Sequence, residues 1–270
     1  MTQIPVIAAK DLVKQFHIFR PITPVKGVSI HVNQGEIVAL LGTNGAGKST
    51  TFDMLSGLTR PTEGAIYLYD ETANDWLDIT REPLYRRALR GICYLPQKPS
   101  IFANLTAREN LLGIMEIMDQ EDLRRSMRSM DSTLQTREDF CDMLLTKFNL
   151  YEHGSKRASN LSGGEQRRLE IARSFIRKPR LILMDEPYAA VDLAGVQLCS
   201  NLFREVRDEG VSILIIDHRI EDILKISDRV YFLNEGLVKM EGTPREIVRD
   251  ELVQSELLAD QVDRMLRIFP

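Results

Sequence analysis

The chain has 270 residues, of which 43% are hydrophobic and 27% are charged. It is long enough to bury a large core, either as one domain with a lobe or as two small domains. The net charge of −4 offers no general attraction to nucleic acid, so we expect no nucleic-acid partner. No stretch approaches the roughly 18 to 20 consecutive apolar residues that span a bilayer. We therefore expect membrane association through partner subunits only.

The cysteines indicate a reducing compartment. Cys93, Cys141 and Cys199 lie far apart and form no C-x-x-C pair, and the chain begins without an apolar signal region. This usage is typical of cytoplasmic proteins, whose thiols stay reduced. We expect a cytoplasmic location.

The first forty residues predict short strands. Apolar stretches at residues 4–9, 28–32 and 37–41 are separated by polar segments. Residues 16–19 lead into a proline-rich stretch, residues 21–24, which predicts a loop or hairpin. In this segment Phe16 can stack on a nucleotide base or pack in the core, and the two interpretations are equally supported.

Residues 42–50, GTNGAGKST, fit the phosphate-loop pattern G-x-x-x-x-G-K-[ST]. An apolar run precedes them, and Phe52, Leu55 and Leu58 follow at helical spacing, which gives the strand-loop-helix setting of the motif. Glycines let backbone N–H groups turn toward an anion, and the helix adds the positive end of its dipole. We expect Lys48 to reach terminal phosphates and Ser49 to hold Mg²⁺. The residues expected to bind the nucleotide are Gly42, Asn44, Gly45, Ala46, Gly47, Lys48, Ser49 and Thr50.

The next segment predicts a strand at residues 64–69, an acidic surface excursion at residues 70–78 and a short basic helix at residues 84–90. Residues 91–95 predict another strand, which ends at Pro96-Gln97. A glutamine just past the carboxyl end of a strand lies where open α/β sheets bind ligands, although a lone glutamine is more often structural.

From residue 106 to residue 150 the pattern changes to helices without strands, which predicts a helical lobe inserted into the α/β core at residues 98–177. Thr106 and Glu109 form a capping box at its start. Apolar side chains then recur at helical spacing; they are Leu123, Met127, Met130, Leu134, Phe140, Met143, Leu144 and Phe148. For the cluster Arg124, Arg125 and Arg128, a solvated helix face is favoured over a binding patch.

A second capping box consists of Ser162 and Glu165, with Gly163 and Gly164 between them. It can be simply a well-capped helix start. However, each glycine weakens a helix by up to about 1 kcal/mol relative to alanine, which favours a functional reason for the pair. Small residues at a helix N-terminus let an anion approach bare N–H groups, so this is a candidate second phosphate site.

The apolar run at residues 181–184 ends in two adjacent carboxylates, Asp185 and Glu186. Neighbouring strand residues point to opposite sides, so we expect Asp185 to serve the Mg²⁺ shell and Glu186 to act as general base on an attacking water. Residues 211–217 predict a further buried strand that ends at His218. At the end of a central strand this histidine is a candidate γ-phosphate contact.

The C-terminal part predicts a hairpin at residues 229–242 and then a capped helix that starts at Thr243-Pro244. An apolar stripe continues to the chain end; its members are Leu257, Leu258, Val262, Met265, Leu266 and Phe269. We expect this helical tail, residues 243–270, to pack on a protein surface, either that of its own core or that of a partner.

The order of these motifs resembles the ATP-binding subunit of ABC transporters over nearly the whole chain, and residues 161–165, LSGGE, match the signature of that family. The resemblance implies an α/β P-loop NTPase fold with an antiparallel β subdomain and an inserted helical lobe. It implies an ATPase that uses ATP and Mg²⁺. It also implies a homodimer in which Lys48 of one copy and Ser162 of the second copy hold the same ATP.

The resemblance implies further roles at the nucleotide. It implies that Phe16 contacts the adenine, that Gln97 joins Ser49 at Mg²⁺, and that His218 contacts the γ-phosphate. Asp185 and Glu186 keep the roles given above. The remaining residues implied at the nucleotide are Ser162, Gly163, Gly164 and Asp192.

Within the family, residues 94–97 and 100–102, with residues 189–192 and 242–244, look most like the lipopolysaccharide-export ATPase and next most like branched-chain amino-acid importer ATPases. This implies transmembrane permease subunits as partners and a peripheral position of this protein on the cytoplasmic face of the inner membrane. Phe102 is a candidate anchor for a partner helix, and core packing is an equally supported interpretation. Ala103-Asn104 replace the basic residues usual in the exporters. The alternatives are a soluble ABC protein, disfavoured by the single cassette, and a P-loop kinase, disfavoured by the signature.

Overall fold

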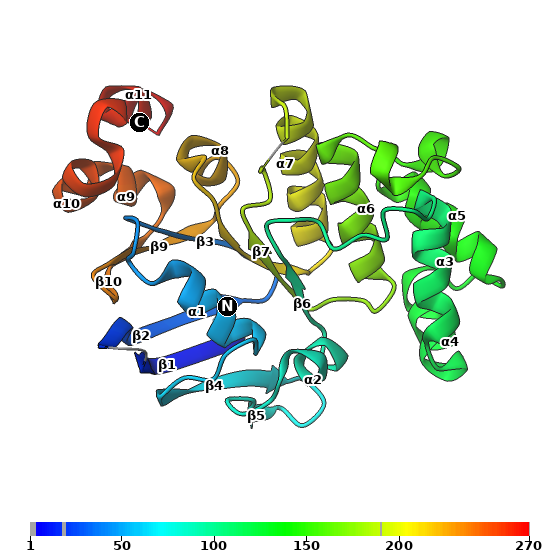
Figure 1. Cartoon of the computed structure of the whole chain (residues 1–270), viewed down its shortest axis with the longest axis horizontal. Coiled ribbons are helices and arrows are strands. Elements are labelled where there is room, and N and C mark those ends of the chain that lie inside the picture. Colours follow the sequence, from blue (N-terminus) through cyan, green and yellow to red (C-terminus); the bar gives the residue numbers. More distant parts are fainter. Residues whose placement is uncertain (1–3, 18–19, 190, 270) are drawn as a thin grey trace. The chain divides into compact units, whose positions relative to one another are not determined.

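The computed structural model describes residues 4–17, 20–189 and 191–269. The chain divides into two compact units, shown by their elements in Figure 1. The first unit comprises Met1–Tyr94, Arg180–Glu186 and Phe203–Pro270, and the second comprises Leu95–Pro179 and Pro187–Leu202. The helical lobe predicted at residues 98–177 falls within the second unit. Ile18, Phe19 and Ala190, which belong to predicted loops, lie outside the described residues.

The N-terminal strands form an antiparallel sheet in the order β2-β1-β4-β5. Its strands are β1 (Pro5–His17), β2 (Pro21–Asn33), β4 (Glu63–Asp70) and β5 (Asp75–Asp78). Residues 16–24 were predicted to form a loop or a hairpin, and the hairpin is confirmed, because β1 and β2 pair in antiparallel orientation up to His17 and Pro21. Pro21 and Pro24 themselves lie in β2. Since β2 is an edge strand of this sheet, prolines cost it few ladder hydrogen bonds. The predicted acidic excursion contains the largely exposed strand β5.

The second sheet has six strands in the order β10-β9-β3-β8-β7-β6. They are β3 (Ile37–Gly42), β6 (Ile92–Leu95), β7 (Leu181–Asp185), β8 (Ser212–Ile216), β9 (Arg229–Asn234) and β10 (Leu237–Gly242). β3 pairs in parallel with β8 and β9, and β7 pairs in parallel with β8, while β9 and β10 form the predicted hairpin. Every residue of β3 and β8 is buried, as expected for parallel strands covered on both faces. The carboxyl ends of β3, β7 and β8 consequently meet at one edge.

The first unit contains short helices around these sheets (Figure 1). They are α1 (Lys48–Ser56), α2 (Leu84–Leu89), α8 (Ile220–Leu224), α9 (Pro244–Arg249), α10 (Glu251–Val253) and α11 (Val262–Ile268). The predicted periodicity of α1 holds for Phe52 and Leu55, which are buried, but not for Leu58. α1 ends at Gly57 in a left-handed conformation, and Leu58 beyond it is 52% exposed.

The C-terminal tail packs on its own unit, which is one of the two predicted surfaces. Thr243 and Glu246 form the expected capping box of α9. Leu258 and Met265 are buried, and Arg264 of α11 forms a 2.6 Å ion pair with Glu221 of α8. Burial of these two members of the apolar stripe gives the reason for the docking, while its other members are half-buried.

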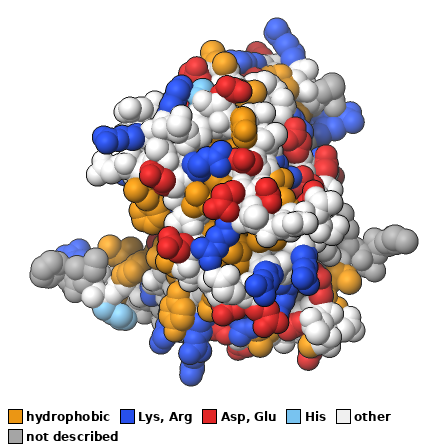
Figure 2. All heavy atoms as spheres, turned by 90° about the vertical axis from the view of Figure 1, so that its right-hand side faces the viewer, with side chains coloured by type: hydrophobic (Ala, Val, Ile, Leu, Met, Phe, Trp, Pro, Cys, Tyr) orange, Lys and Arg blue, Asp and Glu red, His pale blue; other side chains and the backbone are white. Residues whose placement is uncertain are grey.

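The second unit is helical, with α3 (Ala107–Ile117), α4 (Gln120–Met130), α5 (Arg137–Lys147), α6 (Gly163–Phe175) and the first part of α7 (Leu193–Asp208). The capping box of Thr106 and Glu109 is present. Leu134 lies beyond the end of α4, contrary to the predicted stripe. On the face drawn in Figure 2, acidic and basic side chains are interspersed. On α4, Arg125 lies 3.7 Å from Asp122, and both side chains are exposed. This is consistent with the prediction that the arginine cluster belongs to a solvated helix face.

Within the described part of the chain, no helix is long and apolar enough to cross a membrane.

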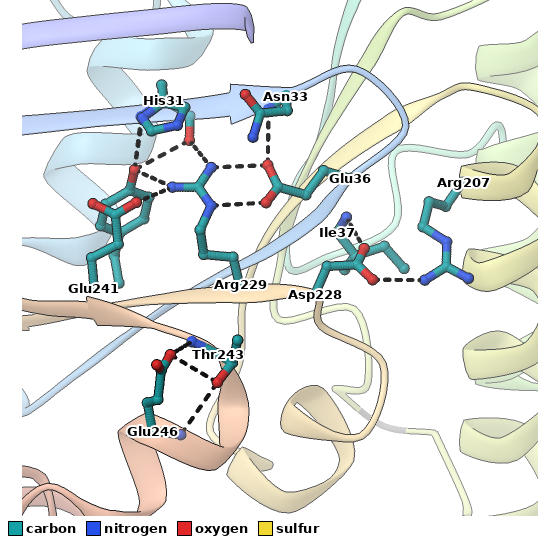
Figure 3. A network of polar contacts seen from close by, with 11 residues as sticks. His31, Asn33, Glu36, Ile37, Arg207, Asp228, Arg229, Glu241, Thr243 and Glu246 are labelled. Carbon is teal, nitrogen blue, oxygen red and sulfur yellow. Dashed lines mark hydrogen bonds and ion pairs between the residues drawn. The ribbon is translucent and has the colours of Figure 1, made fainter. Parts of the chain in front are cut away.

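A largely buried ion pair between Arg229 of β9 and Glu36, the residue before β3, connects the β9–β10 hairpin to the start of β3. Figure 3 shows Arg229 between Glu36 and Glu241. Arg229 donates from Nε and Nη2 to the two carboxylate oxygens of Glu36, at 2.8 and 2.9 Å. Asp228 accepts a hydrogen bond from the backbone N–H of Ile37 at 2.8 Å. These contacts hold the parallel strands β3 and β9 in register.

The Arg229 network predicts a pH dependence of stability through His31, whose Nδ1 lies 3.1 Å from the Tyr231 hydroxyl. Burial, assisted by the charge of Arg229, lowers the pKa of His31 below its ordinary 6.5, although the charges of Glu241 and Glu36 oppose the shift. The unfolded chain then binds the proton at higher pH than the folded chain, so stability falls as the pH drops below 6.5 toward the folded value.

We therefore predict that the Tm decreases between about pH 7 and about pH 5.5 and that His31→Asn makes this decrease smaller. Calorimetry at several pH values measures it. The exposed histidine His17 provides the control His17→Asn, which should leave the slope unchanged. Equal slopes for wild type and His31→Asn would contradict the assignment.

Candidate functional site

The phosphate loop is in close contact with neighbouring backbone at two glycines. A Cβ atom on Gly42 would lie 2.2 Å from the carbonyl oxygen of Leu233, and one on Gly47 would lie 2.4 Å from that of Pro24. Gly47 also has a φ of 97°, which favours glycine. Because these two glycines lack a Cβ atom, the loop can lie close to the backbone of β9 and β2. They also allow the loop N–H groups to point toward an anion.

Hydrogen bonds fix the loop further. The backbone N–H of Gly236, in the β9–β10 turn, donates to the carbonyl oxygen of Ala46 at 3.2 Å. The Lys48 ammonium donates to the carbonyl oxygens of Gly42 and Thr43, at 2.8 and 2.9 Å. Burial lowers the pKa of Lys48, and the carboxylate of Glu186 opposes the shift. The lysine thus lies along the loop, with its charge next to the loop backbone.

The N-terminus of α1 is suited to an anion. Its N-cap is Gly47, and among the described residues no side chain caps the helix by a hydrogen bond. The first N–H groups of an α-helix have no intrahelical partner and carry the positive end of the dipole. Lys48 and Ser49 are the first two helical residues. A phosphate at this point would meet backbone donors, the lysine charge and the serine hydroxyl together.

A pocket brings the loop together with the ends of β7 and β8. Its lining consists of Pro24, Asn44, Gly45, Ala46, Gly47, Lys48, Ser49, Thr50, Glu186, Ile216, Asp217 and His218. Most of the predicted site residues of the first unit thus line one pocket. Sequence analysis missed Pro24, Ile216 and Asp217. The strand-end argument that selected His218 applies equally to Asp217, whereas only the fold brings Pro24 to the pocket.

Glu186 and His218 form a direct pair, with Glu186 Oε1 2.9 Å from His218 Nε2. The backbone N–H of Glu186 donates to the carbonyl oxygen of Ile216 at 2.8 Å, which fixes the end of β7 beside β8. Glu186 has a φ of 45°, an unfavourable conformation for a residue with a side chain. Backbone strain of this kind occurs at functional sites. The carboxylate is held by the imidazole and faces the phosphate loop pocket, as a general base requires.

Asp185 has a different environment from Glu186. It ends β7, and its Oδ2 accepts a hydrogen bond from the Tyr94 hydroxyl at 3.4 Å. Only Glu186 of the two carboxylates belongs to the pocket lining. The role of Asp185 in a Mg²⁺ shell remains a prediction.

Phe16 lies in β1, outside the pocket lining. Its ring is 37% exposed and lies 5.0 Å from the ammonium of Lys14. It is therefore not a core residue, and its contact with an adenine remains a prediction.

The other predicted site residues belong to the second unit. Gln97 is exposed, two residues beyond β6. Ser162 is the N-cap of α6 and its side chain accepts from the backbone N–H of Glu165, which confirms the capping box. Gly163 and Gly164 are the first two residues of α6. Asp192 precedes α7, and its Oδ1 accepts from the backbone N–H of Gly195 at 2.9 Å.

The capping box has a partner that spacing could not identify. His153 Nε2 lies 2.8 Å from Glu165 Oε1, while Glu165 Oε2 accepts from the backbone N–H of Ser162 at 2.7 Å. Glu165 is therefore engaged on both carboxylate oxygens, and the exposed Ser162 stands at the surface of the second unit.

A buried ion pair joins α6 to the segment that contains Gln97. Arg167 and Glu170 have 2% exposed side chains and lie 2.6 Å apart. Arg167 donates to the carbonyl oxygen of Pro96 at 2.9 Å, and Glu170 accepts from the backbone N–H of Ser100 at 2.8 Å. The backbone on either side of Gln97 is thus fixed to the helix that begins at Ser162.

A buried parallel strand, a glycine-rich loop, a helix that begins on the loop and a carboxylate at the end of a nearby strand define a P-loop nucleoside triphosphatase. A family model described as "ABC transporter" matches residues 25–189. The lipopolysaccharide export system ATP-binding protein LptB of Acidithiobacillus ferridurans is 39% identical over 246 residues, 91% of this chain and 95% of the relative. LptB of Escherichia coli strain K12 is 39% identical over 254 residues, 94% of this chain and 97% of the relative.

Solved structures of ABC transporter ATP-binding cassettes have the same fold as this chain. The ADP conformation of MJ1267, an ATP-binding cassette of an ABC transporter, has a TM-score of 0.77 at 27% identity, covering 93% of this chain and 98% of that one. A nucleotide-free ATP-binding cassette from an ABC transporter has a TM-score of 0.73 at 26% identity, covering 97% and 98%. The chain belongs to the ABC transporter family and is an ATP-binding ATPase of that kind.

We predict that Glu186→Gln retains ATP binding and loses turnover. The substitution removes the carboxylate that we expect to act as general base and leaves Lys48 and Ser49 in place, and general-base catalysis contributes about 10² to 10⁴ in rate. Phosphate release and nucleotide titration measure the two effects. The matched control is Glu63→Gln, an exposed acid of β4, which should have wild-type kcat. A Glu186→Gln variant with wild-type turnover would remove Glu186 from the catalytic role.

Proposed function

We propose that this protein is the ATPase subunit of a lipopolysaccharide exporter and drives separate membrane subunits. The observation that supports this cargo is the 38% to 39% identity to lipopolysaccharide export ATP-binding proteins of three organisms, over 91% to 95% of the chain. The relatives are matched almost from end to end, so the similarity covers more than a shared nucleotide-binding core.

The proposed reaction begins with ATP on the phosphate loop. The backbone N–H groups at the start of α1 and the Lys48 ammonium bind the phosphates and orient the terminal phosphoryl group. Thr51 supports this geometry, because its N–H and hydroxyl both donate to the carbonyl oxygen of Gly47 at 2.9 Å. The loop therefore does not have to form when the nucleotide arrives.

Mg²⁺ fits the oxygen donors that this chain offers. We assign it to the Ser49 hydroxyl, with Asp185 in its shell, while the role of Gln97, which belongs to the second unit, remains a prediction. Mg²⁺ suits a site with few protein ligands, because it is commonly held by one or two carboxylates together with substrate phosphates. When bound, it would neutralise phosphate charge.

Glu186 acts on the attacking water in this proposal. Its carboxylate accepts the proton, and His218 orients the carboxylate through the 2.9 Å contact. His218 lines the same pocket as the phosphate loop, so it can also contact a γ-phosphate held there. In this proposal Glu186 after β7 and His218 after β8 act together, which gives both polar residues at this edge of the sheet a role.

The proposed active form is a homodimer that holds ATP between two copies. Ser162 is exposed at the N-terminus of α6, where two glycines follow it. Without bulky side chains the first turn of α6 can approach a phosphate bound to the Lys48 loop of the second copy. Asp192 belongs to the same proposed nucleotide site.

The proposed membrane partners contact Phe102. Its ring is 47% exposed and lies 4.7 Å from the Arg173 guanidinium, so it is not a core residue. Asn110 fixes the loop, because it accepts from the backbone N–H of Phe102 at 2.9 Å and donates to its carbonyl oxygen at 3.0 Å. An aromatic side chain presented by a preformed loop is suited to anchor a partner helix.

We predict that Phe102→Ala keeps ATP affinity and weakens assembly with the membrane subunits. Loss of an aromatic anchor commonly costs about 2 kcal/mol or more of binding free energy. Co-purification with tagged permeases measures assembly. Ile117→Ala, an aliphatic residue 76% exposed at the end of α3, is the matched control. Wild-type assembly of Phe102→Ala would refute this surface.

The same co-purification tests the cargo. Wild-type protein should recover membrane subunits that support lipopolysaccharide release in vesicles. Recovery of an amino-acid permease would refute the exporter assignment and leave the ATPase activity unaffected.

A further inference from the structure

Among the described residues outside the nucleotide pocket, Arg87 is the least exposed charged residue, with an exposure of 0%. It belongs to α2, within a segment that the sequence identifies only as a short basic helix. Its five N–H donors make five hydrogen bonds, which uses the full donor capacity of a guanidinium. The acceptors are the carbonyl oxygens of Met54 (2.7 Å), Leu55 (2.7 Å), Ile79 (2.8 Å), Thr80 (3.2 Å) and Glu82 (2.9 Å).

Two of these acceptors belong to the last turn of α1. The C-terminal carbonyl groups of a helix are unpaired and carry the negative end of its dipole, so a buried cation there is stabilising. The opposite end of α1 is the phosphate-binding end. Burial lowers the pKa of Arg87 to about 10, with the charges of Glu82 and Asp78 opposing, so the side chain stays cationic at neutral pH.

A second contact shows how closely α1 and α2 fit. A Cβ atom on Gly57, which ends α1, would lie 2.8 Å from the backbone nitrogen of Leu84 and 2.9 Å from the carbonyl oxygen of Glu82. α1 has nine residues and is therefore about 13 Å long, short enough to move as a rigid rod. A displacement of its C-terminal turn would carry the phosphate loop with it.

We propose that Arg87 is a positioning residue of the ATPase, which sets the position of α1 and hence of the phosphate loop. The proposal relies on the ATP site described above. α2 exposes Tyr85 (62%) and Leu89 (66%) on its outer side, while Arg87 enters the interior. A shift of α2 would therefore reach the end of α1 through the Arg87 side chain and through the close backbone contact at Gly57.

The test uses Arg87→Lys in the full-length protein. Lysine retains the charge but has three donors on a flexible stem, so it cannot reproduce the five-carbonyl contact. Arg86→Met is the matched control, because Arg86 is an exposed neighbour on the same helix. The measurements are the Kd for ADP, kcat and KM for ATP, and hydrogen exchange of the loop amides, all at a temperature where circular dichroism shows fully folded protein.

For Arg87→Lys we expect a Kd for ADP about tenfold higher and a kcat lower by up to about 10²-fold, as for a misplacement of about 1 Å. Amide exchange should accelerate at residues 43–51 and stay unchanged in β8. Arg86→Met should match the wild type. A folded Arg87→Lys with wild-type Kd, kcat and loop exchange, even if less stable, would overturn the proposal.

Gly57→Ala tests the same contact without changing Arg87, and it decides the question if Arg87→Lys does not fold. Its added methyl group has to push the start of α2 from the end of α1, and the φ of 85° at this position adds strain for any residue with a side chain. We expect weaker ADP binding and faster loop exchange, and wild-type values would overturn the proposal. If the wild type bound no ADP, the ATP site would fail instead.

Discussion

The phosphate loop depends on a close approach of backbone to backbone. Gly42 is next to the carbonyl group of Leu233, and Gly47 is next to that of Pro24. Such contacts require that β9 and β2 occupy fixed positions around the loop. β9 is fixed by its parallel pairing with β3 and by the contacts of Arg229 and Asp228. The anion site is therefore built from strands far apart in the sequence, although its motif is nine residues long.

The parts that the sequence could predict are those determined by nearby residues. The capping boxes at Thr106, Ser162 and Thr243 are present because a cap and its partner lie three residues apart. The apolar runs of β3 and β8 read directly as buried strands. The phosphate loop could be predicted because its glycines, lysine and serine occur at the fixed spacing that phosphate binding requires.

The parts that the sequence could not predict depend on distant contacts. A proline favours a loop locally, yet Pro24 lies in a strand because β2 is at the edge of its sheet. The contact of His153 with Glu165 could not be predicted, because only the fold brings the two side chains together. Arg87 looks like a surface residue in a basic helix, and only the carbonyl groups around it explain its burial. In each case the local preference was overridden by tertiary structure.

The ion pair of Arg229 and Glu36 also constrains which amino-acid substitutions this protein can accept during evolution. Their side chains are 14% and 7% exposed. Removal of one partner of a buried ion pair costs about 3 to 5 kcal/mol when the remaining charge has no other partner. This applies to Glu36 after loss of Arg229, whereas after loss of Glu36 the Arg229 side chain still pairs with Glu241. The order of substitutions therefore matters: a lineage can lose Glu36 first and Arg229 second, whereas the reverse order passes through an unstable variant, although neither residue touches the nucleotide pocket.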